Sequence, residues 1–257
     1  VGLSGNINDV QSFARELERT GAASKEVSRM AIRMGDSLRI SGVDYEEITQ
    51  ATKTLVSTVT DFTMMSREMQ KSLIRDAALF AEAGVSNETY TQGLQIGMKQ
   101  MGLSADEAAK GMRDIRKTAL ALGVPVTELT EDYIQQNEKL AQLGREGPAA
   151  FAELARIQKI TGVEMSKLIA MTDKFDTFEG AGQAVGRLNA ILGGPYLNSI
   201  EMLNATEAER VVMIKEAIEA NGAQFDQLNK FEQKAFASAL GTDVDTLRRM
   251  LNDLDPE

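Results

Sequence analysis

The residue types with the most obvious chemical potential in this sequence are paired carboxylates. A glycoside hydrolase needs two carboxylates about 5–9 Å apart in a cleft, one of them with a pKa raised by burial. The close pairs in this chain all lie in polar surroundings, and nothing in the sequence indicates that one member is more buried than the other. We therefore interpret them as solvated residues at helix termini; the pairs are Glu46 with Glu47, Asp243 with Asp245, and Asp253 with Asp255.

The chain contains no His and no Cys, which excludes several classes of site. Without these residues it can form no disulfide, no thiolate nucleophile, no Ser-His-Asp triad and no zinc site built from Cys and His. A calcium-binding EF-hand loop is also excluded, because the pattern D-x-[DN]-x-[DN]-G does not occur. The sequence therefore predicts no catalytic residue, no cofactor-binding residue and no metal ligand, and a protein that is not an enzyme.

A glycine-rich run at residues 180–186, which reads GAGQAVG, has the composition of a phosphate-binding loop. A dinucleotide-binding fingerprint requires a preceding strand and the spacing G-x-G-x-x-G. Here residues 171–175 are helical in character, and Gly186 stands one residue too late. We therefore expect the small residues of this run to permit close packing between two helices.

Methionines and basic residues form two further groups. Arg113, Arg116 and Lys117 are interrupted by Asp114, which indicates a solvated helix face with weak intrahelical ion pairs. The methionines at helical spacing are expected in the core, although their flexible thioethers could alternatively line an adaptable groove for a partner. These methionines are Met64, Met65, Met69, Met98, Met101, Met165 and Met171.

The overall charge and hydrophobicity narrow the possible partners. The 257 residues are 43% hydrophobic and 26% charged, which is typical of a globular protein, and the formal net charge is −10. Because proteins that bind nucleic acid normally carry an excess of positive charge, we expect no nucleic-acid partner. No apolar run is long enough to span a membrane. Since the chain begins at Val1 rather than Met, we expect a processed chain or a piece of a longer protein.

The strongest pattern in the sequence is a repeat. Gly-Val pairs at residues 42–43, 84–85, 123–124 and 162–163 are separated by 42, 39 and 39 residues, and Gly241 follows 79 residues after the last pair. The start expected near residue 201 is degenerate. Glycine readily ends a helix in the left-handed conformation, and a period of about 40 residues is the length of one two-helix unit. The repeat therefore predicts tandem αα-hairpins.

Helix-start signals and apolar spacing agree with this interpretation. Pro125 stands where a first-turn proline is tolerated. Apolar residues recur at helical spacing and no strand pattern occurs, while the 13 Met and the scarcity of aromatic residues favour an aliphatic helical core. Capping-box spacing, or a close variant of it, occurs in the pairs Asp44 with Glu47, Ser104 with Glu107, Asp176 with Glu179, Thr206 with Glu209, and Asn229 with Glu232.

We therefore predict an all-α fold of tandem αα-hairpins of about 40 residues, arranged as a compact helical array or a short α-solenoid-like stack. The alternative is an all-helical globule whose turns merely resemble one another. Breaks at residues 144–148 and 193–195 are expected to be turns between helices, because Gly-Pro combinations end helices. The second break suggests two parts, a repetitive array at 1–193 and an acidic helical piece at 194–257, unless the two form one continuous domain.

Several segments in the second half carry a resemblance to a known family. They read FDTFEG at residues 175–180 and RLNAILGG at 187–194, and continue through Leu197-Asn198, Met202, residues 208–210 (AER), Phe225-Asp226 and residues 232–236 (EQKAF). Together they resemble segments of tail tape measure proteins, or other large virion structural proteins, of tailed bacteriophages, especially marine phages with contractile tails. The similar region covers residues 175–241, about a quarter of the chain, with a looser match in the upstream Gly-Val repeats.

The resemblance implies a long, mostly helical, non-enzymatic protein that lies within the tail tube, sets the tail length during assembly and leaves on infection. It implies a location in the virion tail after synthesis in the bacterial cytoplasm. The partners that it implies are the tail tube and the tail-tip hub, together with self-association as a trimer.

The glycine punctuation departs from the family pattern. A tape measure body is pictured as long continuous helices with heptad seams, whereas glycines interrupt this chain about every 20 residues. We therefore expect a folded domain of such a protein rather than its measuring rod. Two alternatives are an α-solenoid module that binds a protein on its concave surface and a cell-wall-degrading domain.

Overall fold

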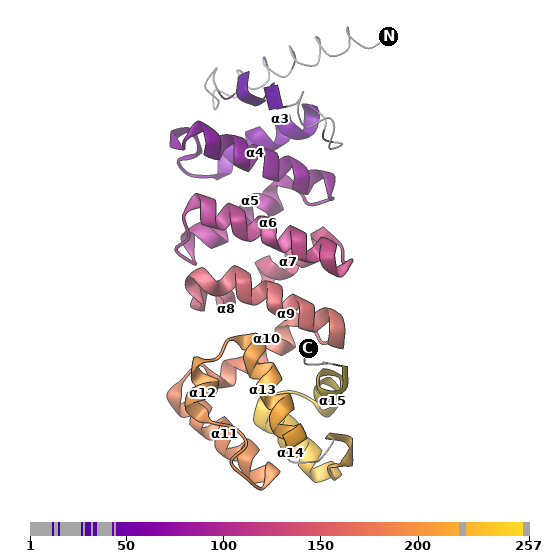
Figure 1. The fold of residues 1–257 in the computed structure, drawn as a ribbon. Coiled ribbons are helices and arrows are strands. Elements are labelled where there is room, and N and C mark those ends of the chain that lie inside the picture. The colour runs from indigo at the N-terminus through magenta and orange to yellow at the C-terminus, as the bar shows by residue number, and fades with distance from the viewer. Residues whose placement is uncertain are drawn as a thin grey trace. The chain divides into compact units, whose positions relative to one another are not determined.

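The computed structural model describes residues 12, 15, 27, 29–31, 33, 34, 43, 45–220 and 225–253. All regular elements in these ranges are helices, which confirms the predicted all-α fold class (Figure 1). The chain divides into two compact units, Val1–Pro148 and Ala149–Glu257, here called unit 1 and unit 2. The division falls at the break at residues 144–148, where the sequence predicts a turn between helices.

Unit 1 is a stack of short helices. Each helix from α3 to α7 packs against the next one along the chain, and α3, α4 and α5 also pack against the helix after that (Figure 1). This nearest-neighbour pattern is that of stacked αα-hairpins. Its helices are α3 (Tyr45–Thr58), α4 (Arg67–Glu82), α5 (Asn87–Lys99), α6 (Ala105–Leu122), α7 (Val126–Gln135) and α8 (Asn137–Gln142), with 3-10 turns η2 (Phe62–Met64) and η3 (Gly144–Glu146).

Unit 2 is a compact bundle rather than a linear stack. Helix α10 packs against α13, and α11 packs against both α12 and α14, so helices distant in sequence become neighbours. Helix α9 (Gly147–Thr161) begins with the last two residues of unit 1. The other elements are α10 (Met165–Thr172), η4 (Asp173–Phe175), α11 (Phe178–Leu192), α12 (Ser199–Asn204), α13 (Glu207–Ala220), η5 (Phe225–Gln227), α14 (Lys230–Leu240) and α15 (Val244–Asp253).

The compact units do not divide at residue 193, the boundary suggested by the sequence. Residues 194–257 belong to the same unit as α10 and α11. The physical reason is that α11 has buried apolar residues, Val185, Leu188 and Leu192, and packs against α12 and α14, both of which follow Gly193.

The glycines of the repeat end their helices in the left-handed conformation. After three of them, the following N–H donates to the carbonyl five residues earlier: Val85 to Phe80 at 2.9 Å, Val124 to Ala119 at 3.0 Å and Thr242 to Ala237 at 2.9 Å. This is the Schellman closure, which satisfies carbonyls left free at the helix end. Gly42 lies outside the described residues, and the described repeat glycines are Gly84 (φ 87°), Gly123 (φ 63°), Gly162 (φ 64°) and Gly241 (φ 69°).

Near residue 201, where the sequence repeat is degenerate, hydrogen bonds from two asparagine side chains fix the start of the next helix. Gly193, with φ 72°, ends α11, and Asn198 caps α12 by accepting from the N–H groups of Ile200 and Glu201. Between them, the Asn189 side chain donates to the Leu197 carbonyl and accepts from the Leu197 N–H, both at 2.8 Å. The Asn189 side chain therefore fixes the turn between α11 and α12.

Three of the predicted capping pairs are confirmed. Ser104 with Glu107 and Asn229 with Glu232 form reciprocal capping boxes. At α13 the Thr206 N–H donates to Glu209 Oε2 at 2.8 Å, and the Glu209 N–H donates to Thr206 Oγ1 at 3.3 Å. Pro125 directly precedes α7.

One predicted pair is wrong and one is not described. Thr177, not Asp176, caps α11 by accepting from the Gly180 N–H at 3.0 Å. The spacing alone could not separate these adjacent residues, and Asp176 instead binds an arginine described below. Asp44, the predicted partner of Glu47, lies outside the described residues.

A second turn motif, not recognised in the sequence, occurs in the described residues of both units. A buried phenylalanine opens a 3-10 turn, and a glutamine eight residues later donates to the carbonyl of that phenylalanine. Gln70 Nε2 donates to Phe62 and Met65 at 2.9 and 3.2 Å. Gln233 Nε2 donates to Phe225 and Leu228 at 3.1 and 3.2 Å. In both cases the glutamine fastens its own helix to the turn before it.

Gly182 within α11 and Gly193 directly after it test the backbone argument with the same chemical change. Gly193→Ala places a Cβ on a left-handed residue, which we expect to destabilise unit 2 by about 1–2 kcal/mol. The added Cβ meets nothing within 4 Å, so the cost is conformational. Gly182→Ala also meets nothing within 4 Å but lies inside the helix, and we expect it to stabilise by about 0.5–1 kcal/mol. Urea unfolding followed by far-UV circular dichroism measures both; equal signs would contradict this account.

Candidate functional site

The predicted carboxylate pairs lie at helix ends. Asp243 caps α15, accepting from the Thr246 N–H at 2.8 Å and the Thr246 hydroxyl at 2.7 Å, and its Oδ2 lies 3.2 Å from Lys167 Nζ. These hydrogen bonds, with a smaller contribution from Lys167, hold the pKa of Asp243 well below its ordinary range. Asp245 is exposed and pairs with Arg249 at 3.3 Å. Their arrangement is that of a helix start and not of a hydrolytic cleft.

The other two pairs are equally peripheral where they are described. Glu46 and Glu47 occupy the first turn of α3. Asp253 is the exposed last residue of α15, and Asp255 lies outside the described residues.

The glycine-rich run lies within helix α11 and follows a 3-10 turn rather than a strand. The predicted close packing of two helices is wrong for Gly182 and Gly186, because both are exposed and an added Cβ would meet nothing within 4 Å. Only Gly180 is confined: its added Cβ would lie 2.6 Å from the Lys174 carbonyl oxygen. The confinement comes from the turn before α11 and not from another helix.

The methionine prediction is confirmed in part. Met101, Met165 and Met171 are buried core residues. Met64, by contrast, is 84% exposed, because it lies in the short turn η2 rather than on the apolar face of a helix. Met65, Met69 and Met98 are half-buried.

The interpretation of the basic cluster on α6 is correct for Lys117 and wrong for Arg113. Lys117 forms an exposed pair with Asp114 at 3.3 Å. Arg113 Nη1 instead donates to Asp76 Oδ2 at 2.6 Å and to Ser72 Oγ at 3.3 Å, which joins α6 to α4. Its partner Asp76 is buried on the apolar face of α4, a position that periodicity alone could have identified as exceptional.

The Asp76–Arg113 pair lies in a mixed environment. Burial raises the pKa of Asp76, while the hydrogen bond and charge of Arg113 oppose that shift. Tyr90 is fully buried, packs against Phe80 with ring centroids 5.0 Å apart, and its hydroxyl has no hydrogen-bond partner among the described residues. The cluster therefore joins helices α4 and α6 within unit 1.

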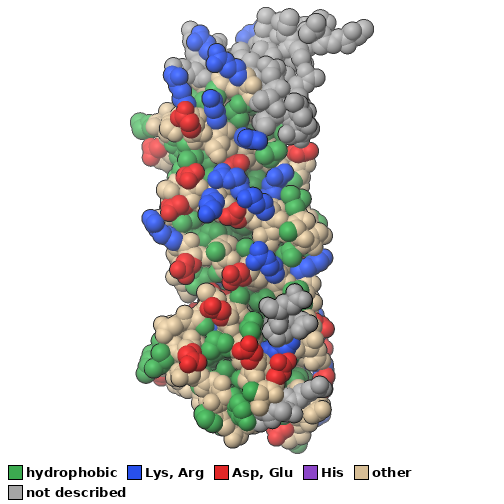
Figure 2. Space-filling view, in the orientation of Figure 1, with side chains coloured by type: hydrophobic (Ala, Val, Ile, Leu, Met, Phe, Trp, Pro, Cys, Tyr) green, Lys and Arg blue, Asp and Glu red, His purple; other side chains and the backbone are tan. Residues whose placement is uncertain are grey.

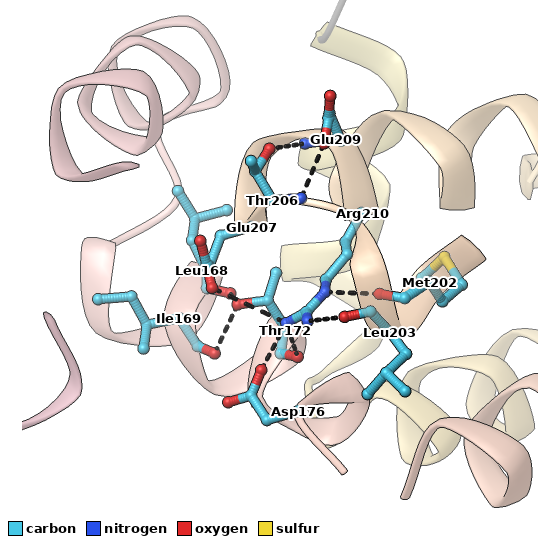
Figure 3. A network of polar contacts seen from close by, with 10 residues as sticks. All are labelled: Leu168, Ile169, Thr172, Asp176, Met202, Leu203, Thr206, Glu207, Glu209 and Arg210. Atoms are coloured by element: carbon cyan, nitrogen blue, oxygen red, sulfur yellow. Dashed lines mark hydrogen bonds and ion pairs between the residues drawn. The ribbon is translucent and has the colours of Figure 1, made fainter. Parts of the chain in front are cut away.

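The most connected polar group in unit 2 is the guanidinium of Arg210, which is 4% exposed (Figure 3). Its Nε donates to the Met202 carbonyl at 2.8 Å and its Nη2 donates to the Leu203 carbonyl at 3.2 Å. Nη1 donates to the Thr172 carbonyl at 3.0 Å and to Asp176 Oδ1 at 2.6 Å. One side chain on α13 therefore holds the C-terminal parts of α10 and α12 and the turn before α11.

Glu207 completes this cluster from one turn earlier on α13. Its Oε1 lies 3.8 Å from Arg210 Nη1. Burial raises the pKa of Glu207, and the charge of Arg210 opposes this shift. A buried carboxyl with a perturbed pKa is a feature of catalytic sites. Here, however, four of the five N–H donors of Arg210 bind the protein itself, so the cluster orders helix ends and presents no array of free groups to a substrate.

Outside these clusters, an apolar groove lies between α12 and α13 of unit 2. It has a volume of about 680 Å³. Most of the side chains that line it are apolar, and the polar ones are Glu201, Asn204 and Glu209. Ile200, on its wall, is 58% exposed. Among the residues that the structure describes, no group of three or more acidic residues could hold a metal ion, and no helix is long and apolar enough to span a membrane.

Comparison with protein families, curated proteins and solved structures finds no match to this chain. The class of protein is therefore defined by the fold: an all-α protein with a hairpin stack in unit 1 and a helical bundle in unit 2.

The cap of α15 predicts a specific pH dependence. Asp243→Ala removes both hydrogen bonds to Thr246 and is expected to cost about 1 kcal/mol of unfolding free energy at neutral pH. Because the pKa of Asp243 is lowered by folding, this contribution is present above the ordinary value of 3.8 and is lost progressively as the pH falls below it. Denaturant unfolding at several pH values measures the effect. Asp245→Ala is the control, and an equal or pH-independent loss in both variants would refute the prediction.

Two arginine–aspartate pairs with the same 2.6 Å separation provide a matched test of burial. Arg210→Ala leaves Asp176, Glu207 and three carbonyls without their partner, and we expect a loss of about 3–5 kcal/mol. Arg210→Lys keeps the charge but not the fork of donors, so its loss should be intermediate.

Arg248→Ala breaks the exposed pair with Asp226 and should change stability little, since exposed pairs contribute little. Urea unfolding of unit 2 compares the three variants. Similar losses for Arg210→Ala and Arg248→Ala would contradict a fastening role for Arg210.

Proposed function

We propose that this chain is a non-enzymatic structural domain of a tailed-phage virion, similar to part of a tail tape measure protein and acting in tail assembly and length determination. The observation that carries the proposal is where the residues of the resemblance lie in the fold. Asp176 forms an ion pair with the buried Arg210, and Asn189, Leu197 and Asn198 form the turn before α12. Residues that fix a fold are those that a shared structural domain requires.

The same correspondence continues toward the end of the chain. Phe225 and Gln233 form the 3-10 turn motif, and Phe225 also packs edge-on against Phe236 with ring centroids 6.4 Å apart. Asp226 pairs with Arg248. The resemblance therefore covers residues whose hydrogen bonds, ion pairs and ring contacts stabilise one folded unit, rather than a helical repeat without such contacts.

A structural role also accounts for the polar clusters. The buried Arg210 binds backbone carbonyls, and the half-buried Arg113 binds the buried carboxylate of Asp76. We propose that the chain acts in the virion tail through its shape and its surfaces. Its partners there are the tail tube, the tail-tip hub and further copies of itself, with which it forms a trimer. Because the helices are short, this part serves as a folded domain of the larger protein rather than as its measuring rod.

Two experiments test the proposal: whether the protein is present in virion tails, and whether tails form without the folded protein. Antibodies to the purified chain should label tails in purified virions, and the signal should fall after genome ejection. Arg210→Ala in the phage gene should yield tailless heads, while Arg248→Ala should yield normal tails. Detection of the protein only in the particle-free lysate, or normal tails from an Arg210→Ala mutant whose protein is unfolded in vitro, would overturn the proposal.

An α-solenoid protein-binding module is the second candidate, and the stack of unit 1 together with the apolar groove at α12–α13 favours it. The two candidates differ in stoichiometry. A binding module captures one cellular protein as a soluble complex, whereas a virion domain is recovered in particles with several copies of itself. Clearing of a peptidoglycan gel by the purified chain would instead support a cell-wall-degrading domain.

A further inference from the structure

A hollow in unit 1 concentrates positive charge in a protein whose net charge is −10. It has a volume of about 690 Å³ and lies between the helical residues 29–31, 33 and 34 and the start of α4. Four cationic side chains line it: Arg29, Arg33, Arg67 and Lys71. Figure 2 shows Lys and Arg side chains gathered at this end of unit 1, near α3 and α4.

The spacing of these cations makes the arrangement unfavourable by itself. Arg29 and Arg33 are four residues apart on one helix, and Arg67 and Lys71 are four residues apart on α4, so each pair is a like-charge pair on one helix face. Among the described residues that line the hollow none is acidic, and Asp61 and Glu68 do not belong to the lining. Repulsion of this kind is relieved when a multivalent anion lies between the charges.

Three of the cationic side chains that line the hollow are also free to bind a ligand. Within the described ranges, Arg29, Arg33 and Lys71 form no hydrogen bond or ion pair. Two guanidinium groups and an ammonium can therefore turn to a ligand, and guanidinium groups bind phosphate oxygens in a two-point geometry.

The start of α4 adds backbone polarity to the same hollow. Ser66, which caps this 16-residue helix, lies in the lining, and so does Arg67 at the first helical position. The first turn of a helix presents N–H groups without intrahelical partners and a partial positive charge, both of which favour a bound phosphate.

The wall of the hollow is fixed before any ligand arrives. Gln70, 5% exposed, lines it and donates to the carbonyls of Phe62 and Met65, so the turn before α4 is fastened to the helix. Met30 and Met65 supply apolar surface beside the cations. A preorganised hollow with apolar and cationic walls suits a ligand that has both an organic body and several negative charges.

We propose that this hollow is a binding site for a phosphorylated small molecule that carries several negative charges, such as an organic diphosphate. The phosphate oxygens bind Arg29, Arg33, Lys71 and the start of α4, and the organic part lies against Met30 and Met65. Neither the virion proposal nor the alternative of a binding module requires such a site.

Inorganic pyrophosphate is the probe, titrated at low ionic strength into the full 257-residue chain. We expect saturable, one-to-one binding by calorimetry and a thermal unfolding midpoint that rises with pyrophosphate concentration. The double variant Arg33→Gln/Lys71→Gln should bind at least about tenfold more weakly. Without pyrophosphate this variant should unfold at the same or a higher temperature, because a repulsion has been removed.

The matched control also removes one Arg and one Lys from unit 1. Lys117 and Arg145 form exposed ion pairs with Asp114 and Glu107, away from the hollow. Arg145→Gln/Lys117→Gln should keep pyrophosphate affinity within about twofold, since these charges act only through screened solvent.

Three results would overturn the proposal. The first is the absence of saturable pyrophosphate binding, and the second is equal weakening in both double variants, which would indicate unspecific attraction. The third is a pocket variant that changes only the oligomeric state of the chain without affecting pyrophosphate, since the cations would then bind an acidic surface of a second copy.

Discussion

The structure depends on one constraint: its described helices are short, and they owe most of their stability to packing against one another. The described α-helices range from 6 residues in α8 to 18 in α6, and isolated helices shorter than about 12–15 residues are marginal in water. Each must bury an apolar face against its neighbours, and fully buried residues such as Leu73, Tyr90 and Ile115 on α4, α5 and α6 supply that face. Unit 1 meets the constraint by ordered stacking, and unit 2 meets it by folding α10 onto α13 and α11 onto α14.

Many short helices also create many helix ends, and each end exposes backbone groups that need partners. Many of the polar side chains that form hydrogen bonds in this protein serve those ends. Ser104, Thr206 and Asn229 serve N-terminal N–H groups. Gln70 and Gln233 bind carbonyls in turns, and Arg210 binds three carbonyls at once. The number of polar side chains that bind the backbone in this protein is therefore largely a consequence of the number of chain reversals.

Local signals made much of this fold predictable from the sequence. The left-handed glycines, the capping boxes and the helical periodicity each depend on residues close together in the chain, and where the structure describes them these predictions agree with it, except for the cap at Asp176. Periodicity identifies an apolar face but not the helix that will cover it, so the closure of unit 2 and the boundary at residue 148 could not be derived.

The same limit applies to the sites. Arg113 looked solvated because Asp76 lies 37 residues earlier, and the partners of Arg210 come from three separate elements. Asp176 and Thr177 are both good capping residues, and the choice between them is set by the distant Arg210. The cationic hollow was missed for the same reason, since its two like-charged pairs are about 35 residues apart and each is unremarkable by itself.

The regular stacking of unit 1 affects how such a chain can evolve. Helices α3 to α7 there pack mainly against near neighbours along the chain, and Gly84 and Gly123 stand 39 residues apart. Removing or duplicating one whole interval presents every remaining helix with a neighbour equivalent to the one it had. Shorter insertions would instead rotate the following apolar faces out of alignment. Such a chain gains or loses length most readily in steps of one complete interval.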